Sequence, residues 1–167
     1  YHARPATSPP ASDQGPPTTG LRDLPGFGEV LGDVADSVLE NGARFARGVL
    51  SPLNAVGDRT PSRCTPDGVV TPPGFAAAYD RFRADGWTAL GVPAEHGGTG
   101  LPTLLAVATG EMWAGANLSF AMCPELAVGA VEALTSHAPE NVRREFLPQI
   151  VSGEWTAAMS LTEPQAG

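Results

Sequence analysis

Residues 86–102 read GWTALGVPAEHGGTGLP, and this stretch decides the fold of the surrounding chain. Four glycines crowd residues 91–100, so this part cannot form a regular helix or strand and is expected to make a specific turn. Pro102 follows, and a proline suits the first position of a new helix. Trp87 and Leu90, just before the glycines, are expected to anchor the turn in a hydrophobic core.

Helical spacing of apolar residues predicts helices on both sides of this turn. Their expected ranges are 33–50, 73–86, 102–116, 124–134 and a short helix after Pro139. Pro52 is expected to close the first helix and Pro124 to start the fourth, because proline lacks a backbone N–H. The helices at 102–116 and 124–134 carry little charge, so both are expected to be buried on several sides.

The remaining segments read as connections. Residues 57–73 are rich in Pro, Asp, Gly and Thr and predict a loop, with a short extended piece at Val69-Val70. Residues 1–20 are dominated by Pro, Ser, Thr, Gly and Ala, and we expect a disordered lead-in. From Trp155 to Leu161 the pattern changes toward extended structure.

Composition excludes several classes of protein. The chain has 10 basic and 18 acidic residues and a formal net charge of -8, which argues against a nucleic-acid partner. Cys64 and Cys123 form no metal-ligand spacing and no disulfide framework, so no metal site is expected. No apolar run is expected to approach the roughly 20 residues of a membrane span, and no signal peptide is visible. A cytoplasmic protein is the simplest expectation.

Separate motifs in this chain resemble those of one family, in the same order. Residues 86–102 resemble the GW..LGVPEEYGGTGLP stretch of the acyl-CoA dehydrogenases. The other matching segments are Gly110-Glu111-Met112, Ala116-Asn117, Phe146-Leu147-Pro148, Ser152-Gly153-Glu154-Trp155 and 161–167. The last of these, LTEPQAG, resembles the family's (L/V)TEPxAGSD signature without its closing Ser-Asp. Residues 43–45, 50–54 and 73–75 resemble the branch that includes methylmercaptopropionyl-CoA dehydrogenase.

The resemblance implies an all-α fold, the helical N-terminal domain of the acyl-CoA dehydrogenases, with the first strand of a β-domain at its C-terminal end. The expected division is a disordered lead-in at 1–20, a helical domain at 21–153 and the truncated start of the β-domain at 154–167. In the family FAD lies between the β-domain and a C-terminal helical bundle. Residues 1–167 alone are therefore expected to be inactive and to bind FAD poorly.

The resemblance also implies site residues. Thr162 matches the threonine whose hydroxyl and backbone meet the flavin ring, Met159 and Leu161 would pack beside the ring, and Gly167 would belong to the same cofactor site. The region from Leu118 to Ala127 would form part of the acyl pocket. Its candidate substrate-binding residues are Ser119, Met122 and Cys123, for which simple core packing is the alternative. The family's catalytic glutamate belongs to the C-terminal bundle, so no catalytic residue is expected here.

Other chemistry has less support in the sequence. The glycines at 97–100 lack the lysine of a phosphate-binding loop. His96 is expected to be an exposed loop residue, and nothing in the sequence brings Glu95, Glu111 and Glu125 into one cleft.

The implied function of the whole protein is α,β-dehydrogenation of an acyl-CoA to the trans-2-enoyl-CoA, with FAD as cofactor. An electron-transfer flavoprotein would accept the electrons, and a homo-oligomer is expected. Two alternatives stay open: a non-catalytic helical module, and an enzyme like the acyl-CoA oxidases, which pass electrons to oxygen.

Overall fold

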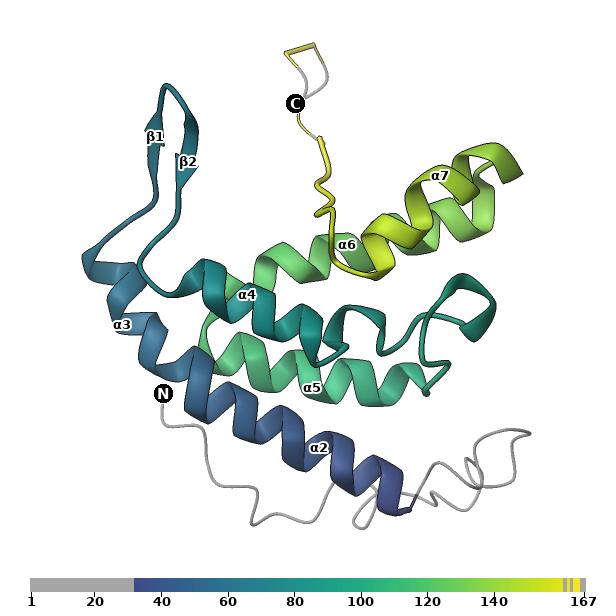
Figure 1. The fold of residues 1–167 in the computed structure, drawn as a ribbon, viewed down its shortest axis with the longest axis horizontal. Coiled ribbons are helices and arrows are strands. Elements are labelled where there is room, and N and C mark those ends of the chain that lie inside the picture. Colours follow the sequence, from purple (N-terminus) through teal and green to yellow (C-terminus); the bar gives the residue numbers. More distant parts are fainter. Residues whose placement is uncertain (1–31, 161, 163, 166–167) are drawn as a thin grey trace.

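The computed structural model describes residues 32–160, 162, 164 and 165, so the predicted lead-in at 1–20 lies outside the described residues. The chain is mostly helical (Figure 1). The helices are α2 (Asp33–Phe45), the π-helical turn η2 (Ala46–Leu50), α3 (Ser51–Arg59), α4 (Phe75–Ala84), α5 (Thr103–Ala116), α6 (Leu118–His137) and α7 (Glu140–Val151). Two 3₁₀ turns, η3 (Trp87–Ala89) and η4 (Ala94–His96), connect α4 to α5. The predicted all-α class is confirmed.

The first helix is longer than predicted, because α2, η2 and α3 follow one another without a break. Pro52 therefore does not close the helix, and the prediction that it would is wrong. The π turn η2 changes the hydrogen-bond pattern just before this proline, which then falls in the first turn of α3. The continuous helix thus accommodates a residue without a backbone N–H at the point where its hydrogen-bond pattern changes.

A short hairpin fills the region predicted as a loop. Strand β1 (Arg63–Thr65) pairs antiparallel with β2 (Gly68–Val70), and Cys64 lies opposite Val69. The extended piece predicted at Val69-Val70 is confirmed, whereas the partner strand β1 was missed. The hairpin and the C-terminal segment both project from the same side of the helices (Figure 1).

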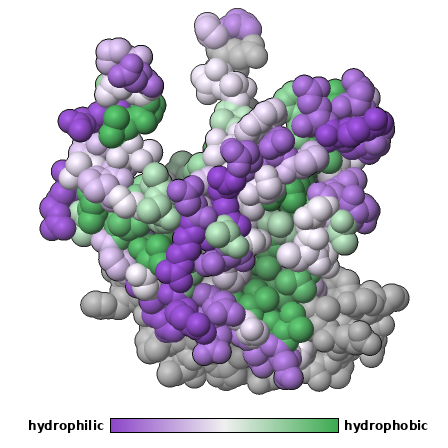
Figure 2. Space-filling model, in the orientation of Figure 1, coloured by the Kyte–Doolittle hydropathy of each residue, from purple (hydrophilic) through white to green (hydrophobic). Residues whose placement is uncertain are grey.

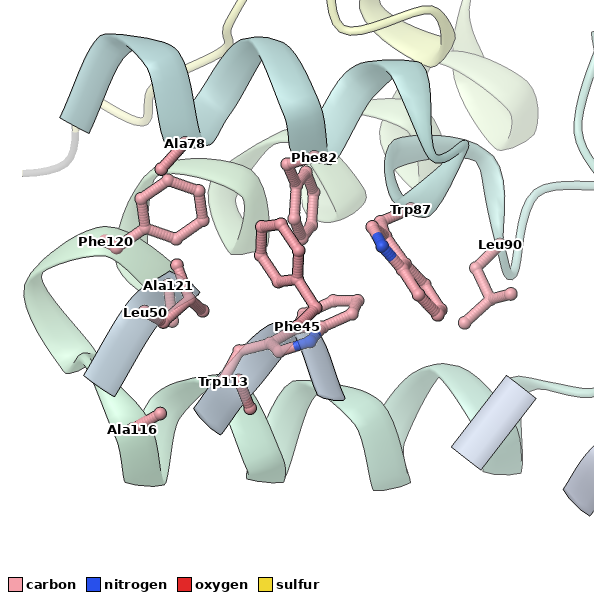
Figure 3. Close-up of a cluster of buried hydrophobic side chains, with 11 residues drawn as sticks. Phe45, Leu50, Ala78, Phe82, Trp87, Leu90, Trp113, Ala116, Phe120 and Ala121 are labelled. Atoms are coloured by element: carbon pink, nitrogen blue, oxygen red, sulfur yellow. The ribbon is translucent and has the colours of Figure 1, made fainter. Parts of the chain in front are cut away.

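Aromatic side chains from four helices and a 3₁₀ turn form the main core (Figure 3). The ring of Phe82 lies 4.7 Å from that of Trp113 and 5.7 Å from that of Phe120, both in edge-to-face geometry. Trp87 meets Trp113 in the same way at 5.3 Å. The prediction that Trp87 and Leu90 anchor the chain in the core is confirmed.

The glycine-rich segment forms a compact turn over a second, smaller core between α6 and α7. Backbone bonds close it, from Thr99 N to Ala89 O at 3.0 Å and from Gly100 N to Val92 O at 2.9 Å. Gly97 and Gly100 have positive φ angles of 85° and 67°, which favour glycine. The predicted irregular turn is confirmed.

Helix α6 begins earlier than predicted. It starts at Leu118, and Pro124 lies inside it, so the prediction that Pro124 starts this helix is wrong. Asn117 caps the helix because its side chain accepts a hydrogen bond from Phe120 N at 3.1 Å. This cap, and not Pro124, therefore sets the start of the helix.

Helices α5 and α6 carry little charge, but many of their side chains are exposed. Several large apolar side chains on these helices are exposed, namely Leu104, Val107, Leu118, Met122, Leu126 and Val128. The prediction that both helices are buried on several sides is therefore wrong for the described residues. Figure 2 shows one face of the molecule, on which hydrophilic side chains gather at the upper right, over the end of the α6–α7 pair.

By length and composition alone, α6 could cross a membrane, and it is the one such helix in the described part of the chain. The expectation that no apolar run approaches this length is corrected here. A single helix of this kind is weak evidence for a span, because core helices of globular proteins meet the same criteria. In this structure α6 packs against α5 and α7.

The segment after α7 is irregular. Residues 156–160 form neither a helix nor a strand, and among the described residues β1 pairs only with β2. A β-strand needs a neighbouring strand to satisfy its backbone groups. The first strand of a β-domain at this end, and the domain boundary at 153, therefore stay predictions.

Gly98 offers a sharp test of the turn. A Cβ atom at this position would lie 1.9 Å from the carbonyl oxygen of Val92, so the turn would have to open. We expect Gly98→Ala to lower the free energy of unfolding by about 3 kcal/mol or more. Urea unfolding of the 167-residue chain, followed by circular dichroism, measures this change.

Gly110→Ala is the matched control, because a Cβ at this position in α5 meets nothing within 4 Å. Alanine favours helix over glycine by up to about 1 kcal/mol, so this variant should be neutral or more stable. Equal loss of stability in both variants would show that the close approach of Gly98 to Val92 is unimportant.

Candidate functional site

The outer face of α6 is largely apolar, with the exposed Glu125 at its edge. Leu118, Met122 and Leu126 follow one another at intervals of four, so they form one stripe along the helix. Their exposed fractions are 56%, 56% and 43%. Ser119 and Cys123 lie one position further on and are also exposed, at the edge of the same stripe. We call these five residues the α6 face.

All three residues predicted to bind substrate therefore lie on the α6 face. Ser119, Met122 and Cys123 are exposed, so core packing within the described chain does not account for them. Leu118 and Leu126 belong to the same surface but were not among the predicted contacts. Their spacing at i, i+4 and i+8 around Met122 is the signal that could have found them.

The opposite side of α6 fixes this orientation. Phe120, Ala121, Pro124 and Val131 are buried on that side. The ring of Phe120 contacts Phe82 of α4, so rotation of α6 would remove an aromatic side chain from the core. The α6 face is thus held outward by the packing beneath it.

A groove of about 630 Å³ runs between α5 and α6. Val107, Gly110, Ala121 and Val128 are among its apolar lining residues. Glu111, Glu125 and Glu132 also line it. Sequence reasoning found no cleft shared by Glu111 and Glu125, because the two residues lie on different helices. The indole N–H groups of Trp87 and Trp113, which line the same groove, are buried without a hydrogen-bond acceptor among the described residues.

A second hollow, of about 680 Å³, lies between the glycine-rich turn and α7, and both charged and apolar residues line it. His96 and Glu95 line it from the turn, and His96 is half-buried rather than fully exposed as predicted. The cations of α7 on this side already have partners. Arg143 Nη2 lies 2.9 Å from Glu140 Oε2, and Arg144 pairs with the same carboxylate at 3.9 Å.

Burial changes the acidity of two groups. Cys123 is exposed as a residue, but its thiol is partly buried, and this burial raises the pKa above its ordinary value because it disfavours the charged thiolate. Burial also raises the pKa of Tyr79, and the nearby Cys123 adds to that shift while Arg83 opposes it. At neutral pH both side chains are therefore neutral, and Cys123 is not activated as a nucleophile.

The predicted cofactor residues lie on the segment after α7. Met159 is 67% exposed and Thr162 is also exposed, whereas Leu161 and Gly167 lie outside the described residues. An exposed thioether can pack on a flat ring, and a hydroxyl and backbone N–H groups can donate hydrogen bonds to one. The chemistry of these two side chains fits a flavin. The described residues contain no cluster of three or more His, Cys, Asp or Glu that could hold a metal ion.

Comparison with known proteins bears on these surfaces. Residues 38–154 match the family model described as the N-terminal domain of acyl-CoA dehydrogenases. The chain is 39% identical over 141 residues to a 3-methylmercaptopropionyl-CoA dehydrogenase of Ruegeria pomeroyi, which covers 84% of this chain and 24% of that protein.

Two further relatives have similar coverage. A butyryl-CoA dehydrogenase of Syntrophomonas wolfei is 32% identical over 81% of this chain and 22% of its own length. A broad-specificity linear acyl-CoA dehydrogenase of Mycobacterium tuberculosis is 28% identical over 84% of this chain and 23% of its own length. The chain thus spans about a quarter of the length of the curated relatives it matches.

The acidity of Cys123 can be tested directly. We expect its alkylation by iodoacetamide to have a pH midpoint above that of a small thiol peptide, because burial disfavours the reactive thiolate and so fewer thiolates exist at a given pH. In the 167-residue chain, Cys64→Ser leaves Cys123 as the one cysteine. The rate of Cys123 alkylation is then followed by mass spectrometry from pH 7 to 10. A midpoint at or below that of the peptide would contradict the expected burial.

Proposed function

Because the chain belongs to the acyl-CoA dehydrogenase family, as its N-terminal helical domain, we propose that the protein oxidises an acyl-CoA thioester at its α and β carbons. The α carbon would lose a proton and the β carbon a hydride, which leaves the trans-2-enoyl-CoA as product. The observation that carries the proposal for this chain is the exposed, largely apolar α6 face with Ser119, Met122 and Cys123 on it.

The α6 face suits a hydrocarbon chain. Leu118, Met122 and Leu126 present apolar surface, and the exposed Glu125 lies at the edge of this stripe, where it also lines the groove between α5 and α6. Each CH₂ group that leaves water gains about 0.8 kcal/mol. Met122 is unbranched and flexible, so it can adapt to acyl chains of different shape. We therefore assign to α6 one wall of the acyl pocket, which binds the chain and excludes water from it.

The segment after α7 suits the cofactor. FAD, when bound, supplies the hydride acceptor for the β carbon. The hydroxyl and backbone N–H of Thr162 would donate hydrogen bonds to the ring, and Met159 would pack beside it, together with Leu161 and Gly167. Donors placed near the ring change how readily the flavin is reduced.

The proton is removed by a residue outside these 167 residues. In this family the base is a glutamate of the C-terminal bundle, so no residue of this chain is assigned that role. Electron-transfer flavoprotein as electron acceptor and a homo-oligomeric assembly belong to the same proposal, as does a cytoplasmic location. The 3-methylmercaptopropionyl-CoA dehydrogenase relative makes a sulfur-containing acyl-CoA one substrate to test.

The decisive experiment uses the full-length protein. We expect it to purify yellow with bound FAD, and an acyl-CoA added without oxygen should bleach the flavin absorption band. A panel that varies chain length and includes 3-methylmercaptopropionyl-CoA identifies the substrate. Protein without flavin would favour a non-catalytic helical module, and rapid recovery of the band in air without an added acceptor would favour an oxidase-like enzyme.

The role of the α6 face can be tested with Met122→Trp. The larger side chain would fill space that the acyl chain needs, so kcat/KM for the longest substrates should fall about tenfold or more relative to short ones. Val70→Trp is the control, because Val70 is equally apolar and exposed but lies on the hairpin. Similar chain-length profiles in both variants would remove α6 from the acyl pocket.

A further inference from the structure

The end of α7 is bound to α4 and η3 by a set of contacts that the proposed site does not use. Tyr79 Oη donates to Gly153 O at 3.2 Å, and Thr88 Oγ1 donates to Val151 O at 2.8 Å. Arg83 Nε donates to Ser152 O at 3.4 Å, and its guanidinium pairs with the carboxylate of Glu154. We call these contacts the exit latch, because the chain leaves the helical body at this point.

The latch occupies the space left by a glycine. Gly153 has a φ of +72°, and a Cβ on it would lie 2.8 Å from both Arg83 Cγ and Thr88 Cγ2. Any other residue would therefore be strained in its backbone and would push the two side chains away. The close approach lets the donors of Arg83, Tyr79 and Thr88 reach successive carbonyls at the end of α7.

A second set of contacts holds the next residue. Trp155 N donates to Gln149 O at 2.9 Å, and the Trp155 ring packs edge-on against Phe146 at 5.8 Å. The backbone from Val151 to Trp155 is thus fixed on both sides. Figure 1 shows the chain running away from the helices beyond this point.

From these contacts we infer that Arg83 is a positioning residue for the flavin contact of this chain, since the exit latch sets where the segment bearing Met159 and Thr162 begins. Residues 154–162 can span at most about 30 Å when fully extended. Because the start of this segment is fixed, Thr162 can lie only within that distance of it. Loss of the exit latch would free the start of the segment, which could then leave the helices in many directions. The inference rests on the proposed function, which assigns Met159 and Thr162 to the flavin.

The structure explains why Arg83 is the residue to change. It is the one latch side chain that combines a backbone acceptor, Ser152 O, with an ionic partner, Glu154. The ion pair is partly exposed, with side-chain exposures of 28% and 58%, so it adds little to stability. Its loss should therefore change the direction of the exiting segment more than it changes the fold.

The experiment uses the full-length protein with Arg83→Met. We expect its Kd for FAD to rise at least tenfold and the position of the flavin absorption band to shift, while the thermal midpoint of the apoprotein changes little. Arg83→Lys, which keeps the charge opposite Glu154, should recover much of the affinity. Gly153→Ala should also raise the Kd for FAD, because the added Cβ would push Arg83 and Thr88 away from the end of α7.

Arg81→Met is the matched control. Arg81 lies on the same helix and pairs with Asp85 at 3.6 Å, but it makes no latch contact. If Arg83→Met and Arg81→Met bind FAD equally well, the inference is overturned while the proposed function stands. If the unmodified full-length protein binds no FAD, both are overturned. A shift in the flavin band confined to the Arg83 and Gly153 variants supports the latch.

Discussion

Asn117 holds together the parts of this domain that carry its surfaces. It is 1% exposed and lies alone between α5 and α6. Its Oδ1 accepts from Phe120 N at 3.1 Å, and its Nδ2 donates to Leu50 O at 3.3 Å. One amide therefore starts α6 and ties that corner to the long first helix. An apolar residue here would remove both side-chain hydrogen bonds, each worth about 1 kcal/mol, while Phe120 N would keep its bond to the backbone carbonyl of residue 117 at 3.2 Å.

The start of α6 decides which of its residues face water. Successive residues of a helix are rotated by about 100°, so a start shifted by one residue would turn every side chain of α6 by that angle and move core residues toward the surface. With the cap at Asn117, Phe120 and Ala121 point into the aromatic core, and Leu118 and Met122 point outward. The α6 face is thus a consequence of the buried amide and the aromatic packing beneath it.

Sequence reasoning located the elements whose causes are local. Glycines predicted the turn at 91–100, and aromatic residues predicted the core around Trp87, because both depend on residue type. It failed at Pro52 and Pro124, because the helix boundaries there depend on a π turn and on the Asn117 cap and not on the prolines. It also could not say what covers α5 and α6, since apolar composition shows that a helix avoids water but not which neighbour shields it. Resemblance to a family named Ser119, Met122 and Cys123, but only the structure shows that they share one surface.

The two sides of α6 have different freedom to change. The inner side meets Phe82 and other buried side chains, where a change of even one methylene alters packing. The outer side is exposed in the described part of the chain, so a change of side-chain size there is less constrained. Its apolar groups gain about 25 cal/mol for each Å² that a ligand or another part of the protein removes from water. Substitutions on the α6 face can therefore alter the surface that this helix presents outward without disturbing the core that holds the helix.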